Sequence, residues 1–223
     1  MPCLLKKTQN YKDRSSEYFG GNLMKLFQLF WALTIMLWAN VSYSQDYDMG
    51  LEAAMSGDFK TAYGIWKPLA EGGDPYAQNG LGMLLRRGDG VEVDSKEAAK
   101  WFQLSADQGL IMPFYSLGEM YEAGEGVIQD LKKSFELYSI AAENGFVDAQ
   151  TTLGAWYEVG HGGVEQSYEK SFEWYLLAAE QEDVFAMCRV AYRYEEGLGV
   201  EKNKSKAGEL YDVVKKLGEK CEE

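Results

Sequence analysis

Apolar residues in the middle of the chain recur with the spacing of an α-helix. Between Pro113 and Gly145, a first run begins near Phe114, and its apolar residues stand three or four positions apart, on one side of a helix. These residues are Leu117, Met120 and Tyr121. Two glycines, Gly124 and Gly126, follow the run and suit a turn with positive φ. The pattern predicts a helix, helix A, that ends at these glycines.

A second amphipathic run follows and predicts a second helix, helix B. Asp130 stands in front of it and is placed to accept hydrogen bonds from the exposed amides of the first turn. Gly145 closes it. Its apolar face consists of Phe135, Leu137, Tyr138, Ala141 and Ala142. Because only a short glycine loop separates the two helices, we expect them to form an antiparallel hairpin.

The same hairpin pattern recurs before and after this stretch, with an offset of about 36 residues. The matching positions are Leu81-Gly82, Leu117-Gly118 and Leu153-Gly154 within helix A, Gly88, Gly124, Gly160 and Gly197 after it, and Gly109, Gly145 and Gly218 after helix B. A fixed period of this length indicates stacked units that bury their apolar faces only against their neighbours.

The repeats also define the expected domain organisation. Residues 45–73 predict an N-terminal capping hairpin, residues 74–218 predict four full repeats, and residues 219–223 form a short tail. The predicted fold class is therefore all-α, a right-handed α-solenoid of antiparallel helix hairpins.

The repeated residues resemble those of a known family. The pattern A-x-x-x-L-G-x-x-Y-x-x-G-x-G-V-x-x-D-x-x-K-[AS]-x-x-[WY]-[YF]-x-x-A-A-x-x-G is similar to the Sel-1-like repeat, a relative of the tetratricopeptide repeat, from residue 47 to residue 218. Ala191 departs from it at the helix A glycine, Ser167 and Asn203 at the loop aspartate, and Glu182 at the closing glycine. We expect these departures to alter single turns and to leave the assignment intact.

The first 44 residues differ from the repeats. Residues 1–23 are polar and irregular, so we expect no structure there and hypothesise that they lie upstream of the true start codon. Residues 24–44 combine a lysine, an apolar run and small residues spaced as a cleavage site, which is typical of a signal peptide. An uncleaved anchor or a buried helix is the alternative, but the run is shorter than the roughly 20 residues of a transmembrane helix. We expect export to the bacterial periplasm, cleavage near Gln45 and no stable membrane anchor afterwards.

The charge balance narrows the expected partners. The formal net charge is −13, with 22 Lys and Arg against 35 Asp and Glu. Because such a surface repels phosphate backbones and anionic lipid, we expect no nucleic-acid binding and no peripheral membrane binding. The charge favours a protein partner with a basic surface, or no partner.

Cysteine usage gives a further hint of compartment. Cys3 would be lost with the leader, which leaves Cys188 and Cys221, an even number in an exported chain. Cys188 stands early in the last helix A, and Cys221 stands just before the place where another repeat would begin. The two are either a disulfide or a pair of free thiols.

The sequence offers little catalytic or metal-binding chemistry. It contains one histidine, His161, in a glycine-rich turn where an exposed loop residue is expected. One histidine and two distant cysteines do not make the usual zinc sites, and the carboxylates are spaced as solvated helix faces. We therefore predict no metal, no cofactor and no enzymatic activity.

Binding is expected on the inner, concave wall that the A helices of such an array line. The positions opposite the buried side of helix A are Asn79, Met83, Arg86, Tyr115, Glu119, Glu122, Thr151, Glu158, Tyr192 and Glu195. The mixture of aromatic and acidic residues is typical of an interface. The alternative is a solvated face without a specific ligand.

The resemblance implies a protein-binding role. Members of the resembled family act as adaptors in envelope assembly, as signalling regulators, as binders of host proteins and as periplasmic immunity proteins. We expect a periplasmic scaffold or adaptor, with an immunity protein against a secreted antibacterial effector as the alternative. A second alternative is a hydrolase of a cell-wall or β-lactam ligand, which some exported relatives have been suggested to be.

Overall fold

The structure is a computed structural model that describes residues 46–221. The chain divides into two compact units, Met1–Met49 and Gly50–Glu223. Of the first unit, residues 46–49 are described, and they are helical. The segment of residues 1–23, predicted to lack structure, and the predicted signal peptide of residues 24–44 lie outside the described residues.

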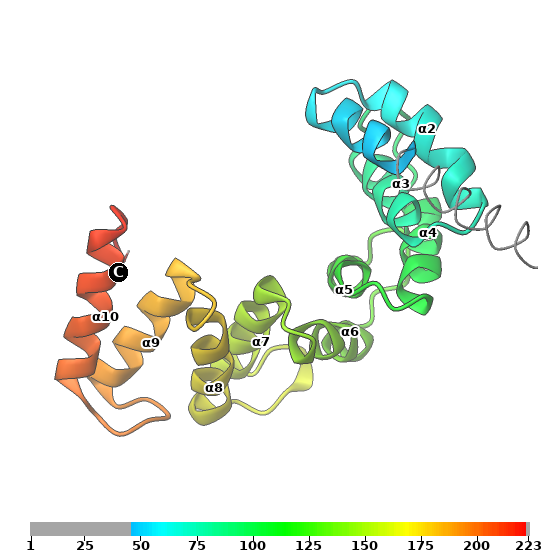
Figure 1. Cartoon of the computed structure of the whole chain (residues 1–223). Helices are drawn as coiled ribbons and strands as arrows, with labels where there is room; N and C mark the ends of the chain where they lie inside the picture. The colour runs from blue at the N-terminus through cyan, green and yellow to red at the C-terminus, as the bar shows by residue number, and fades with distance from the viewer. Residues whose placement is uncertain (1–45, 222–223) are drawn as a thin grey trace, which may run out of the picture. The chain divides into compact units, whose positions relative to one another are not determined.

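The second unit is a succession of helices (Figure 1). Residues 50–55 are helical, and the helices that follow are α2 (Phe59–Glu71), α3 (Pro75–Arg87), α4 (Ser95–Asp107), α5 (Met112–Ala123), α6 (Leu131–Glu143), α7 (Val147–Val159), the short 3₁₀ helix η1 (His161–Gly163), α8 (Tyr168–Ala179), α9 (Val184–Glu196) and α10 (Lys204–Lys216). All regular secondary structure within residues 46–221 is helical, so the all-α prediction is confirmed.

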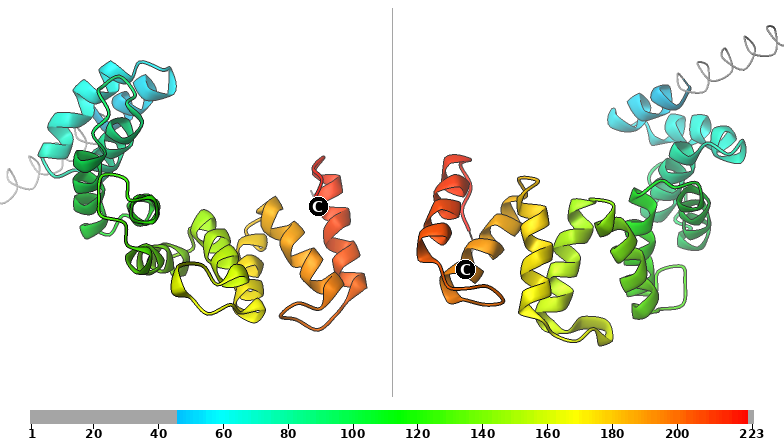
Figure 2. Two further views of the ribbon diagram at one scale, coloured as in Figure 1. Left: turned by 180° about the vertical axis from the view of Figure 1, so that it is seen from behind. Right: turned by 60° about the horizontal axis from the view of Figure 1, so that its bottom comes forward.

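Each helix packs chiefly against the helix before it and the helix after it, from α2 to α10. The views in Figure 2 show the same side-by-side order. The predicted helix A of each repeat is α3, α5, α7 or α9, and the predicted helix B is α4, α6, α8 or α10. The hairpin array expected from the repeats is therefore confirmed.

Side-chain caps begin the B helices, including those whose loop residue departs from the repeat pattern. Asp130 Oδ1 accepts a hydrogen bond from the Lys133 amide at 2.9 Å. Ser167 and Asn203 take the place of this aspartate and still accept from the amide three residues on. Since serine and asparagine are also good N-caps, these substitutions leave the helix starts unchanged.

One departure does leave a mark on the backbone. Glu182 takes the place of a closing glycine and keeps its left-handed conformation, with φ of 65°. It is the one non-glycine residue with positive φ within residues 46–221. The turn is therefore retained, although a side chain makes this conformation less favourable than it is for glycine.

Glycines in the middle of the A helices allow the hairpins to close. A Cβ atom at Gly118 of α5 would lie 2.6 Å from the Tyr138 ring of α6, and one at Gly154 of α7 would lie 2.8 Å from the Tyr175 ring of α8. Both tyrosines are about 1% exposed. The core therefore consists of large rings of helix B set against the bare backbone of helix A.

No helix within residues 46–221 has the length and apolar content that a membrane crossing requires.

Candidate protein-interaction site

The residues predicted to line the inner wall all retain exposed surface, and they lie on α3, α5, α7 and α9. We call this surface the helix-A wall. It comprises Asn79, Met83, Arg86, Tyr115, Glu119, Glu122, Thr151, Glu158, Tyr192 and Glu195. Contacts between successive A helices join its parts, as described below.

Three carboxylates of the helix-A wall are held by tyrosines of the following helix B. Tyr138 Oη donates to Glu122 at 2.8 Å. The pairs Tyr175 with Glu158, at 3.3 Å, and Tyr211 with Glu195, at 3.2 Å, repeat this contact in the next two hairpins. The sequence shows both members of each pair at repeated positions, but only the fold brings them together. Each of these carboxylates is thereby fixed at the edge of the wall.

The first repeat replaces this pair, and the replacement links two hairpins. Phe102 and Arg86 occupy the positions of the tyrosine and the glutamate. Arg86 instead donates to Glu119 at 2.7 Å and to Glu125 at 2.9 Å, both beyond its own hairpin. Because the two carboxylates lie on α5 and in the loop after it, Arg86 bridges the first and second repeats.

Glu158 is the centre of a second ionic cluster of the wall. It forms ion pairs with Arg189 and, at 3.0 Å, with Arg193, both on α9. The Arg193 side chain is 1% exposed, and its guanidinium also lies over the rings of Tyr168 and Tyr175, at 5.6 Å and 5.3 Å from their centroids. A buried cation is stable only when paired in this way. Glu158 therefore stabilises the fold by pairing with a buried cation, in addition to any contact with a partner.

The environment of these pairs alters proton affinities. Burial, with the Glu158 charge beside it, raises the pKa of Tyr175 to about 12. Burial and the hydrogen bond to Glu122 raise the pKa of Tyr138 as well. Burial lowers the pKa of the Arg193 guanidinium, and the Glu158 charge opposes that shift. The tyrosines therefore remain neutral hydrogen-bond donors well above neutral pH.

His161 is not an isolated loop residue. Its Nε2 lies 3.3 Å from Glu122 Oε1, and its ring meets Trp156 edge-on at 4.5 Å between centroids. The side chain is 42% exposed. These contacts tie the turn after α7 to α5, which gives His161 a packing role.

An exposed apolar edge, which the sequence pattern did not predict, borders the helix-A wall. Tyr76, Met112 and Phe185 are 54%, 46% and 57% exposed. Tyr76 and Met112 stand three residues before the wall residues Asn79 and Tyr115, at the start of α3 and α5, and so share the wall face of their helices. Phe185 occupies the equivalent position at the start of α9, three residues before Cys188. The equivalent residue of α7 is Asp148. The three-residue offset was the sequence signal that could have revealed this edge.

Contacts between hairpins place the apolar edge beside the wall residues. Asn79 Nδ2 donates to Met112 Sδ at 3.5 Å, which joins α3 to α5. Tyr115 lies against Phe146 at 5.2 Å and against Tyr138 at 5.3 Å between centroids. The apolar edge and the aromatic part of the wall are therefore neighbours on one side of the second repeat.

Cys188 and Cys221, which the sequence predicted to be either a disulfide or two free thiols, form a disulfide in the structure. Cys188 of α9 and Cys221 of the tail have Cα atoms 5.4 Å apart. The bond brings the tail back to the A side of the last hairpin. This arrangement encloses a groove between α9, α10 and the tail.

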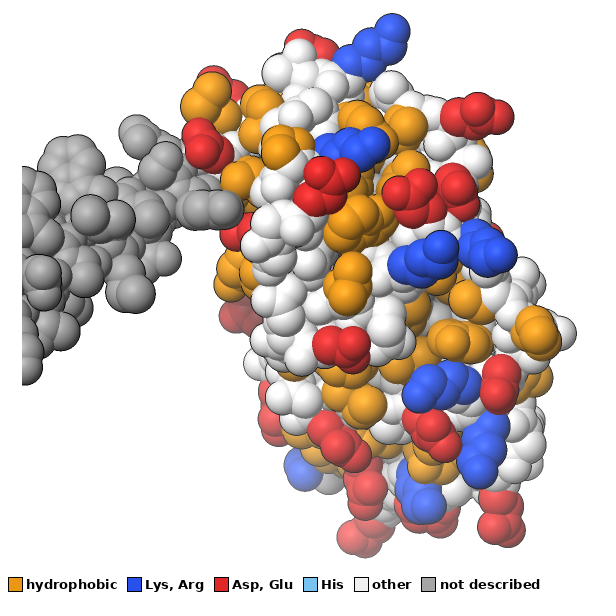
Figure 3. Space-filling view, turned by 90° about the vertical axis from the view of Figure 1, so that its right-hand side faces the viewer, with side chains coloured by type: hydrophobic (Ala, Val, Ile, Leu, Met, Phe, Trp, Pro, Cys, Tyr) orange, Lys and Arg blue, Asp and Glu red, His pale blue; other side chains and the backbone are white. Residues whose placement is uncertain are grey.

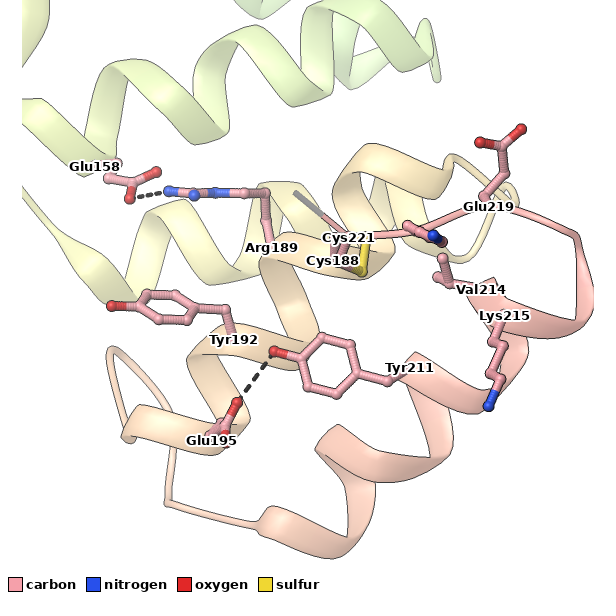
Figure 4. A pocket seen from close by; sticks show the side chains of 11 residues that line it. Glu158, Cys188, Arg189, Tyr192, Glu195, Tyr211, Val214, Lys215, Glu219 and Cys221 are labelled. Carbon is pink, nitrogen blue, oxygen red and sulfur yellow. Dashed lines mark hydrogen bonds and ion pairs between the residues drawn. A yellow bond between two sulfur atoms is a disulfide. The ribbon is translucent and has the colours of Figure 1, made fainter. Parts of the chain in front are cut away.

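This groove, which we call the C-terminal groove, is the end of the helix-A wall (Figure 4). Its volume is about 920 Å³, and Arg189, Tyr192, Tyr211, Val214, Lys215 and Lys220 are among the residues that line it. In Figure 4 Arg189 points toward Glu158, and Tyr211 reaches Glu195. A groove of this size is large enough for a peptide segment or a small molecule.

Figure 3 shows one face on which hydrophobic side chains lie scattered among acidic and basic ones. No group of three or more His, Cys, Asp and Glu side chains is positioned to hold a metal ion within the part of the chain that the structure describes.

The fold and the wall together define a helical-hairpin repeat protein with aromatic and ionic side chains along the exposed side of its A helices. The Sel1 repeat model matches residues 75–110, 115–146, 147–183 and 184–212, which is more than half of the chain. The chain therefore belongs to the Sel1 repeat family, as the resemblance of its motifs predicted. Sel1 repeat proteins are right-handed solenoids that serve as protein-interaction scaffolds, and the family is generally non-catalytic.

Solved structures support the assignment. The chain is similar to c5321, a protective antigen of uropathogenic Escherichia coli strains, with 34% identity and a TM-score of 0.73 over 79% of this chain and 38% of that one. It thus spans about two fifths of that relative's length. A Sel1 repeat protein from Oxalobacter formigenes has 28% identity and a TM-score of 0.71, over 78% of this chain and 71% of that one.

A third similar structure is the immunity protein Pa5087 from Pseudomonas aeruginosa. It has 25% identity and a TM-score of 0.52, over 77% of this chain and 64% of that one. A search of curated proteins found no match.

Proposed function

We propose that this protein is a periplasmic scaffold that binds a partner protein through the helix-A wall and its apolar edge. The observation that carries the proposal is the exposed row of Tyr76, Met112 and Phe185 beside fixed carboxylates. Large apolar and aromatic side chains supply most of the binding energy of protein interfaces, and a polar rim around them supplies specificity. The periplasmic location rests on the signal-peptide pattern of residues 24–44.

Two carboxylates of the wall are paired within the chain, and this pairing limits how charge contributes to partner binding. Glu119 is engaged by Arg86, and Glu158 by two arginines. Such groups act on a partner chiefly through the long-range field of a chain with net charge −13. We therefore expect a basic partner surface to speed association, and the apolar edge to hold the complex together.

The test is a pull-down from periplasmic extract with residues 45–223 as bait. Changing Tyr76, Met112 and Phe185 together to alanine should abolish capture of the partner, with a loss of affinity of about a hundredfold for three anchor residues. The matched control changes three exposed apolar residues of the B helices to alanine, namely Leu104, Ile140 and Leu177.

The two triple variants separate the possible outcomes. Capture that survives the first change, or that is lost equally in both, would contradict binding through the apolar edge. The carboxylates are better tested by Glu119→Gln and Glu122→Gln than through Glu158, because Glu158 holds the buried Arg193. These two changes should slow association and reduce its salt dependence.

A second candidate function is that of an immunity protein. The observation that favours it is the similarity to the immunity protein Pa5087. In this case the neighbouring gene should encode a secreted antibacterial effector, and co-production of this protein in the periplasm should protect cells from that effector. Neighbouring envelope genes, with no protection, would support the adaptor role instead.

A further inference from the structure

The C-terminal groove differs in charge from the rest of this acidic protein. Its carboxylates Glu158 and Glu195 are already engaged, the first by Arg189 and Arg193 and the second by Tyr211. Glu219 also lines the groove and is exposed. Two of the three carboxylates that line the groove are therefore already engaged within the chain.

Its lysines, in contrast, are available. Lys215 and Lys220 line the groove, are exposed, and form no ion pair with any carboxylate of residues 46–221. With Arg189, they give the lining of the groove three cationic side chains against three carboxylates. The groove is thus locally balanced in charge, in a chain whose net charge is −13, and two of its cations are unpaired lysines.

The floor of the groove is apolar and held in place. Val214 is 1% exposed, and the rings of Tyr192 and Tyr211 flank it. The Cys188–Cys221 disulfide anchors the tail that carries Lys220. A ligand would thus meet a preformed surface with an apolar floor and cationic rim, which lowers the entropic cost of binding.

We propose that the C-terminal groove binds an acidic, extended peptide segment of the partner protein. Carboxylates of the segment pair with Lys215 and Lys220, and an apolar side chain of the segment packs on Tyr192, Tyr211 and Val214. Charge complementarity selects this occupant, because a basic segment would meet the unpaired ammonium groups. The inference rests on the proposed scaffold function only in assigning the segment to the partner.

The experiment measures peptide binding to residues 45–223 with the disulfide intact, by fluorescence anisotropy. The probe is a short labelled peptide of alternating glutamate and leucine, and the comparison peptide has lysine in place of glutamate. The acidic peptide should bind, and should bind less tightly as salt is raised, because the attraction between exposed charges is screened. The basic peptide should not bind.

A pair of variants locates the binding. Lys215→Glu with Lys220→Glu should weaken binding of the acidic peptide at least about tenfold. The control, Lys204→Glu with Lys216→Glu, makes the same change of net charge on α10, and Lys216 shares the last helical turn with Lys215. Neither control residue lines the groove, so the control should keep the affinity within about twofold.

Three results would overturn the inference. They are no binding of the acidic peptide, tighter binding of the basic peptide, and equal weakening by both variant pairs. If the reversed-charge pair does not fold, Lys215→Gln with Lys220→Gln answers the same question. The peptide assay uses purified protein alone. If it fails, the proposed scaffold function is still tested separately by the pull-down.

Discussion

Single residues at the middle of each hairpin determine how closely its two helices approach. Gly118 and Gly154 lie directly against the rings of Tyr138 and Tyr175, and the same rings hold wall carboxylates through their hydroxyl groups. A tyrosine of helix B therefore fills the core with its ring and orients the surface with its hydroxyl. Packing and the presentation of the wall depend on the same residue.

Substitution of Gly118 by alanine should destabilise the protein. The new Cβ would lie 2.6 Å from the Tyr138 ring, and overpacking of this kind costs about 1–3 kcal/mol in the free energy of unfolding. The control is Gly208→Ala in α10, where nothing lies within 4 Å of the added atom. That change should stabilise by about 0.5–1 kcal/mol, because alanine favours a helix. Urea unfolding measures both, and equal effects would contradict the close packing.

The raised pKa of Tyr175 predicts a loss of stability at alkaline pH. The folded state keeps this proton up to a pKa of about 12, whereas the unfolded chain releases it at its ordinary value. The stabilisation is therefore fully present below the unfolded pKa, and it declines as the pH rises from about 10 to about 12, by about 2–3 kcal/mol.

Comparison with Tyr175→Phe isolates this effect. The phenylalanine variant should show a shallower fall of the unfolding free energy over the same pH range, because it has no proton to lose there. Tyr192→Phe, at an exposed position, is the control. Parallel profiles for Tyr175→Phe and the unchanged protein would argue against the assignment to Tyr175.

At the scale of elements, polar side-chain contacts link successive hairpins on the wall side. Arg86 joins α3 to α5, His161 joins the turn after α7 to α5, and Arg189 and Arg193 join α9 to α7. Helix B rings and alanines supply the apolar packing, as in the cluster around Tyr175 and Val190. Each interface between repeats thus has an apolar interior and a polar margin.

The disulfide should contribute measurably to the last hairpin. Cys188 and Cys221 are 33 residues apart in sequence, and closing a loop of that length stabilises by about 3–4 kcal/mol in the chain-entropy model. The double change Cys188→Ser with Cys221→Ser should lower the free energy of unfolding by that amount. Detection of two free thiols in the denatured, unreduced protein would show that the bond does not form.

At the scale of the whole molecule, the chain combines a local repeat architecture with a strong acidic charge. The formal charge of −13 attracts cationic surfaces at long range. The C-terminal groove is a local exception to this field. On the two proposals above, the acidic wall attracts a basic surface of the partner, and the C-terminal groove holds an acidic segment of the same partner.

Export is predicted to remove the first part of the chain. Amino-terminal sequencing of protein recovered from periplasm should begin near Gln45, because the small residues Ser42 and Ser44 suit signal cleavage. A protein that keeps residues 24–44 and stays with the membrane fraction would contradict the prediction and support an uncleaved anchor.

The sequence by itself determined the repeat length, the helical hairpins and the cap at Asp130, because these depend on neighbours within one or two helical turns. It also placed the wall residues on the exposed side of helix A. That Ser167 and Asn203 also cap their helices was shown by the structure.

Only the tertiary structure decided which wall residues are already engaged, and it revealed the apolar edge and the groove. The ionic contacts join residues that are 31 to 39 positions apart, such as Arg189 with Glu158 and Arg86 with Glu125. Such pairs form only at a particular angle between hairpins. That angle results from many weak packing contacts, which no local sequence pattern encodes.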